Sequence, residues 1–129
     1  MGAQVWLAAG AAAGAVGVIL GAFGAHALRG RLPEAAIATW QTAVAYQFTH
    51  ALALIAVGML LRQGGASARA LLVAGAAFCL GTVFFSGSLY GLALGGPRWL
   101  GPITPLGGAA FIVGWVALLV AVLRVPGDV

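Results

Sequence analysis

The chain has 129 residues, of which 63% are hydrophobic and 6% are charged, and its mean hydropathy is +1.10. An ordinary soluble domain carries about a quarter charged residues, so this composition excludes a soluble globule and predicts an all-α membrane protein surrounded by lipid. The formal net charge is +4, but the arginines stand at the ends of apolar runs and form no continuous basic face, which argues against nucleic acid as a partner.

The first apolar stretch covers residues 3–28 and is predicted to be a retained membrane-spanning helix, because no basic segment precedes it and it is longer than the core of a signal peptide. Its glycines recur every three or four residues and predict a helix-packing face, since small residues let helices approach closely in lipid. These residues are Gly10, Gly14, Gly17, Gly21 and Gly24. A smooth face toward a ligand or an oligomer axis is the alternative.

The segment 33–42 mixes alanines with polar residues, and Pro33 suits the first turn of a helix. This segment is predicted to start the second span at the membrane interface, with a short separate interfacial helix as the alternative. Trp40 suits both, because indole rings favour the headgroup level. The apolar second span is expected over residues 43–61, which puts His50 about two turns, or about 10 Å, below the start of that span.

The third and fourth spans are expected over residues 70–94 and 106–123. Cys79 and Trp115 fall in the middle of these spans and are interpreted as packing residues. Gly107 and Gly114 give the fourth span a small-residue face of its own. Each stretch is close to the roughly 20 residues that cross a bilayer, so residues 1–129 are predicted to form one domain, a bundle of four transmembrane helices closed by Arg124 and Asp128.

Polar residues concentrate on one side of this predicted bundle. Four alternating spans bring the end of the first, the start of the second, the end of the third and the start of the fourth to the same leaflet. The sequence therefore predicts one polar cluster there, made of His26, Tyr46, Gln47, His50, Ser86, Ser88 and Thr104. His50 in particular is expected to find its hydrogen-bond partner on the first or third span, at His26, Ser86 or Ser88.

The polar cluster has two main interpretations. The first is structural, with polar side chains bridging helices for about a kcal/mol or less per contact. The second is a binding or permeation site for a small polar molecule, a lipid headgroup or a proton, because ionisable residues inside a membrane are usually functional and histidine changes charge near neutral pH. A serine hydrolase lacks a buried carboxylate to orient its histidine, and zinc lacks a third ligand, so no metal or other cofactor is predicted.

Four segments also resemble one known membrane family. They are Gly21–Leu28 (GAFGAHAL), Trp40–Leu54 (WQTAVAYQFTHALAL), Phe85–Tyr90 (FSGSLY) and Gly101–Gly108 (GPITPLGG). In this order they resemble the domain-of-unknown-function family four-two-three, the YgdD-like bacterial inner-membrane proteins, which are similar to animal transmembrane protein two-five-six. The resemblance covers nearly the whole chain. It implies a multi-pass inner-membrane protein and supplies no reaction.

The sequence thus favours a non-enzymatic scaffold or accessory component of the inner membrane, with a ligand, lipid or proton site as the alternative. Membrane lipids are the expected partners, and a homo-oligomer or a membrane partner protein is a further possibility. Three arginines flank the spans on each side, so the positive-inside rule does not choose an orientation.

Overall fold

The structure is a computed structural model that describes residues 2–124. Those residues are almost entirely helical and form no β-strand. In chain order the segments are α1 (Gly2–Phe23), the π-helical η1 (Gly24–Leu28), α2 (Glu34–Gln63), α3 (Ala68–Gly81), the π-helical η2 (Thr82–Ser86), α4 (Gly87–Ala93), the 3₁₀-helical η3 (Arg98–Leu100) and α5 (Ile103–Leu123). They build four helical stretches long and apolar enough to cross a membrane, as the sequence predicts.

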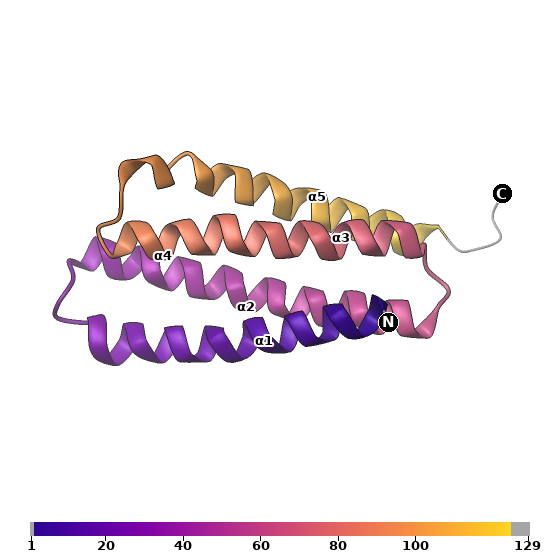
Figure 1. Cartoon of the computed structure of the whole chain (residues 1–129), viewed down its shortest axis with the longest axis horizontal. Helices are drawn as coiled ribbons and strands as arrows, with labels where there is room; N and C mark the ends of the chain where they lie inside the picture. The colour runs from indigo at the N-terminus through magenta and orange to yellow at the C-terminus, as the bar shows by residue number, and fades with distance from the viewer. Residues whose placement is uncertain (1, 125–129) are drawn as a thin grey trace.

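The four spans run alongside one another (Figure 1). α1 packs along α2, and α5 packs along α3 and η2, so the chain forms two hairpins. The hairpins meet where α2 contacts α3 and α4, where α1 contacts α3, and where side chains of α2 contact α5. The first and fourth spans are less buried than the second and third, so more of their surface faces lipid.

The second span is longer than its apolar part. α2 starts at Glu34, directly after Pro33, and continues to Gln63, so within residues 2–124 there is no separate interfacial helix before it. Hydropathy marks the part of a helix that sits in hydrocarbon, whereas the helix itself extends through the headgroup layer. Gly64, at φ +71°, ends α2, and its N–H donates to the carbonyl of Leu60 at 3.1 Å.

Two wide turns interrupt the α-helical pattern. η1 ends the first span, and η2 lies between α3 and α4 in a continuous helix over residues 68–93. A π-helical turn holds more residues than an α-helical one and rotates the side chains that follow it. The faces presented near His26 and Ser86 therefore differ from those of an ideal α-helix.

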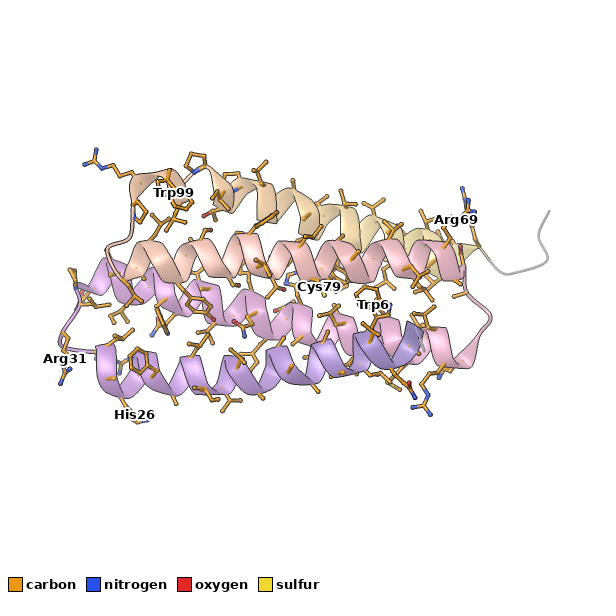
Figure 2. All side chains as sticks on the ribbon, viewed as in Figure 1. Trp6, His26, Arg31, Arg69, Cys79 and Trp99 are labelled. Atoms are coloured by element: carbon orange, nitrogen blue, oxygen red, sulfur yellow. The ribbon has the colours of Figure 1, made fainter. Side chains whose placement is uncertain are left out.

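The fourth span starts earlier than its apolar pattern indicates. α5 begins at Ile103, so Thr104 lies inside its first turn, and η3 precedes it. Trp99 on η3 lies at this end of the molecule (Figure 2), and its 64% exposure matches an interfacial indole. Arg124 follows α5, and Asp128 lies outside the described residues.

The apolar core lies between α2, α3 and α5, where Leu54, Val57 and Phe78 are almost fully buried. The sequence predicts that the Trp40 ring contacts the headgroup layer. In the structure the ring is enclosed between helices instead, because only 3% of Trp40 is exposed. Its indole N–H donates to the carbonyl of Leu20 at 2.8 Å and so joins α2 to α1. The ring lies against Gly24, where a Cβ would come within 2.5 Å of the indole.

The glycines of the first span divide into two groups. Gly10, Gly17 and Gly24 are buried, and a Cβ at Gly10 would lie 2.7 Å from the backbone oxygen of Ala51 on α2. Gly21 makes only an ordinary contact with Val44, and Gly14 has no atom within 4 Å of its Cβ position. On α5, Gly107 and Gly114 lie against Phe85 and Phe78. Close packing in the first span therefore follows every seventh residue.

Candidate functional site

Gln47 is the centre of a fully paired contact between three helices. Its side-chain amide donates to the carbonyl of Ala13 on α1 at 2.9 Å, and its oxygen accepts from the hydroxyl of Tyr90 on α4 at 2.7 Å. The residue is 5% exposed. Both ends of the amide are satisfied inside the protein, so Gln47 joins the two hairpins and offers little to a ligand.

Ser86, Ser88 and Thr104 form a second set of paired groups. The Ser86 hydroxyl, 1% exposed, donates to the carbonyl of Ala43 on α2 at 2.7 Å. The Ser88 hydroxyl, at 3.0 Å from the carbonyl of Phe85, also shares a hydrogen bond with the Thr104 hydroxyl on α5. These contacts join α2, α4 and α5. Neither serine bonds to His50, so the pairing that a serine nucleophile needs is not formed.

His26 lies apart from the other predicted site residues. It is exposed, and its side chain projects from the outer edge of α1, away from the other three spans (Figure 2). The turn that carries it is the π-helical η1, and its place in the same leaflet as the other residues does not fix the direction of its side chain. The predicted single cluster of seven residues is therefore two sets of internal pairs, together with Tyr46, His50 and the separate His26.

His50 has a partner that the sequence did not indicate. The indole N–H of Trp115 on α5 donates to His50 Nε2 at 3.1 Å. Indole is only a donor, so Nε2 must carry the lone pair and Nδ1 must carry the proton. That proton is donated to the carbonyl of Tyr46 at 2.7 Å. The expected partners His26, Ser86 and Ser88 are wrong, because the side-chain partner of His50 is on the fourth span, while its contact with the third span is the ring of Phe78.

His50 lies near the middle of α2, about 24 Å along the axis from Glu34 and about 10 Å from Ala43, where the apolar part of the span is expected to begin. The ring stacks on Phe111 of α5, with centroids 3.5 Å apart and planes 7° apart, and its edge faces Trp115. Trp115, expected to be buried, is 45% exposed. An imidazole near mid-membrane thus lies against aromatic rings beside the lipid-facing surface.

A groove opens between α2 and α5 at this point. Its volume is about 740 Å³, and we call it the α2–α5 groove. Tyr46, Thr49 and His50 line it from α2, Phe111, Trp115 and Gly108 line it from α5, and Phe85 of η2 also lines it. It extends along α5 from Trp115 to Pro105, which is about 15 Å of helix.

Tyr46 gives the groove an available polar group. The residue is 44% exposed, and its ring packs on Phe85 at 4.4 Å between centroids. Within residues 2–124 its hydroxyl has no hydrogen-bond partner, whereas the hydroxyl of Thr49 donates to the carbonyl of Ala45 at 3.0 Å. A hydroxyl in a lipid-facing hollow retains the capacity to donate one hydrogen bond and accept others.

Metal binding finds no support in the part of the chain that the structure describes. No three His, Cys, Asp or Glu side chains come together there in a group that could hold a metal ion. The site consists of aromatic rings, one hydroxyl and one imidazole whose two nitrogens are already bonded. Such a surface is suited to bind an apolar molecule and to orient one polar atom of it.

Comparison with known proteins adds a family to this geometry. A family model described as "Protein of unknown function (DUF423)" matches residues 20–108, a range that holds all seven predicted polar residues. The UPF0382 membrane protein SERP0230 of Staphylococcus epidermidis is 42% identical over 124 residues, which cover 96% of this chain and 99% of the relative. The UPF0382 membrane protein YwdK of Bacillus subtilis is 41% identical over 122 residues, which cover 94% and 98%. No solved structure matches the chain.

Proposed function

Because this chain belongs to the DUF423 family of membrane proteins, whose matched relatives are named as membrane proteins without an activity, we propose that it is a non-enzymatic membrane component that binds a lipid-soluble molecule in the α2–α5 groove. The observation that carries the proposal is the groove itself, a hollow of about 740 Å³ with a mid-span histidine and an available tyrosine hydroxyl. Ligand sites are commonly apolar hollows of this size with a few polar groups.

The distribution of paired and unpaired polar groups supports this proposal. Gln47, Ser86, Ser88 and Thr104 have partners on other helices, which accounts for their presence as structural contacts. Tyr46 lies on the same helix but directs its ring toward the groove, where structural pairing does not account for its hydroxyl. Polar groups in hydrocarbon are costly without a partner, so a molecule that accepts from this hydroxyl would be stabilised there.

The lining residues define the chemical class of the ligand. Phe85, Phe111 and Trp115 offer flat, apolar surfaces, which suit an isoprenoid, aromatic or acyl group. Tyr46 suits a carbonyl or ester oxygen on that molecule. Among residues 2–124, no lysine, arginine or acid lines the groove, so a charged ligand is not expected.

The test fills the groove without disturbing its walls. Gly108 lines the groove, and the nearest atom to its Cβ position is on Phe85 at 3.9 Å, so Gly108→Leu adds a side chain into the hollow. Gly87→Leu is the matched control, because Gly87 is exposed, lies outside the groove and has no atom within 4 Å of its Cβ position. Native mass spectrometry of the protein released from its own membrane measures the bound lipid-soluble molecules.

The parent and Gly87→Leu are expected to retain the same small molecule, and Gly108→Leu is expected to lose it while melting at the parent temperature. An identical set of bound molecules in all three proteins, or an empty parent, contradicts the proposal. The chain is a multi-pass membrane protein with four candidate α-helical spans. Its assignment to the inner membrane is part of the same proposal, and the α-helical spans support it, since outer-membrane proteins of bacteria are built from strands.

A scaffold role is the second candidate, and the low burial of the first span favours it. Only 11% of the apolar window of the first span is buried, against 39% for the second and third. A partner helix, from another copy or from another membrane protein, would cover this edge. Disulfide cross-linking of a Cys79→Ser protein with Cys introduced at Gly14, in native membranes, is expected to give a dimer or a discrete adduct. Finding only monomer removes this candidate.

A further inference from the structure

Two adjoining hollows lie at the end of the molecule where α1 turns into α2. One, of about 350 Å³, is lined mainly by apolar residues, among them Gly21, Ala25, Trp40 and Phe48. The other, of about 450 Å³, contains Arg29 and Glu34. Ile37 and Gln41 line both hollows, so the two form one depression, which we call the α1–α2 depression.

The depression runs from the membrane edge into hydrocarbon. Arg29 and Glu34 flank the turn between the helices, at the level where lipid headgroups lie, whereas Phe48 lies about 10 Å deeper along α2 than Gln41. The depression is charged at the membrane edge and apolar deeper in the membrane. A phospholipid has the same arrangement, with its charged headgroup at the surface and its acyl chains below. The α2–α5 groove differs, since no charged residue lines it.

We propose that the α1–α2 depression binds one phospholipid whose headgroup carries both a phosphate and a primary ammonium group, as phosphatidylethanolamine does. The Arg29 guanidinium pairs with the phosphate, and the Glu34 carboxylate accepts hydrogen bonds from the ammonium. The Gln41 amide is placed to bond to the glycerol ester, and one acyl chain lies over Val44 and Phe48.

Glu34 makes the site selective. An interfacial arginine by itself attracts any lipid phosphate, and anionic lipids most strongly. Glu34, on the same rim, repels the net negative charge of phosphatidylglycerol, and it attracts the trimethylated ammonium of phosphatidylcholine by charge alone, because that group is bulkier and has no N–H to donate. The combination therefore favours the ethanolamine headgroup over both. This site is independent of the ligand proposed for the α2–α5 groove.

The experiment titrates the purified full chain in detergent with phosphatidylethanolamine, phosphatidylglycerol or phosphatidylcholine of the same acyl chains, read by native mass spectrometry. The parent is expected to bind phosphatidylethanolamine at least about threefold more tightly than the other two, the scale of one exposed charge pair. Glu34→Gln is expected to remove that preference in favour of phosphatidylglycerol. Arg29→Gln is expected to weaken all three, whereas Arg31→Gln, a nearby exposed arginine outside the depression, should bind as the parent does.

The acyl chain has its own pair of variants. Ala25→Phe fills the apolar floor, and Ala22→Phe adds the same ring at an exposed position that does not line it. Only Ala25→Phe should lower phosphatidylethanolamine binding. The proposal is overturned if the parent shows no headgroup preference, if Glu34→Gln leaves the preference unchanged, if Arg29→Gln and Arg31→Gln have equal effects, or if the two phenylalanine variants bind alike. Because every substituted residue is exposed, the variants are expected to melt as the parent does.

Discussion

The two flanks of α2 use polar residues in opposite ways. Toward α1 and α4, Gln47 is enclosed, and both ends of its amide are bonded to other helices. Toward α5, Tyr46 and His50 lie at an open groove, within one helical turn of the same Gln47. A polar residue inside a membrane is therefore structural where helices close around it and available for binding where they separate.

The packing of α1 against α2 on the closed flank depends on glycine. A large side chain at this contact should give the largest loss of stability. Gly10→Leu puts a side chain against the backbone oxygen of Ala51, which cannot move away without shifting α2. We expect the free energy of unfolding to fall by about 1 to 3 kcal/mol, as for overpacked cores. Reversible unfolding in mixed detergent micelles measures it.

Gly14→Leu is the matched control for this prediction, because Gly14 belongs to the same series of glycines but has no atom within 4 Å of its Cβ position. Its stability should match that of the parent. Equal losses in the two variants would mean that α1 meets α2 through a different face.

Removing the enclosed amide should have the next largest effect. Gln47→Leu keeps a similar volume but leaves the partly buried Tyr90 hydroxyl and the Ala13 carbonyl without their partner. We expect a loss of about 1 to 2 kcal/mol in the free energy of unfolding. Thr42→Val, which removes a hydroxyl bonded only within its own helix, should change stability by less than about 0.5 kcal/mol. A Gln47→Leu protein as stable as Thr42→Val would contradict the enclosed flank.

On the open flank, a conservative change at the histidine contact should cost less. Trp115→Phe removes the N–H that donates to His50 Nε2 and keeps an aromatic ring against the edge of His50. Because Trp115 is partly exposed, we expect a loss below about 1 kcal/mol. The freed Nε2 should be detectable by ¹⁵N NMR of labelled His50, as a shift toward the signal of a lone pair without a donor. An unchanged imidazole spectrum would show that the indole contact is not made.

The sequence predicts the spans of this protein well and the facing of its helices poorly. Four apolar stretches follow directly from hydropathy, and the pairing of small residues with close contacts holds at Gly10 and Gly17. His50 with Trp115 was not predicted, because their contact joins positions 65 residues apart and depends on how α5 is rotated. A mid-span tryptophan has one donor to satisfy, and that signal could have indicated a partner for the histidine.

The position of His26 shows a second reason for the difference. Assignment to one leaflet fixes the level of a residue but not the direction of its side chain, and η1 and η2 are π-helical turns that change the phase of the residues that follow. Extra helical turns also lie outside the apolar runs, which is why α2 starts at Glu34. Helix ends and helix rotation both require the backbone, and composition supplies neither.

The smallest effect on stability should accompany the clearest effect on binding. Tyr46→Phe removes one oxygen from a partly exposed ring that makes no hydrogen bond through it within residues 2–124, so the free energy of unfolding should stay within about 0.5 kcal/mol of the parent. Tyr90→Phe removes the same oxygen from the enclosed flank, where it donates to Gln47, and should be less stable by about 1 kcal/mol.

The same two variants test binding. If the Tyr46 hydroxyl orients the ligand of the α2–α5 groove, the lipid-soluble molecule that copurifies with the parent should be at least about threefold less abundant in Tyr46→Phe, because one hydrogen bond contributes about 1 kcal/mol. Tyr90→Phe should retain that molecule, since Tyr90 does not line the groove. Native mass spectrometry and unfolding in the same preparation give both quantities. Full retention by Tyr46→Phe would mean that the hydroxyl takes no part in binding, and would leave the aromatic walls as the whole of the site.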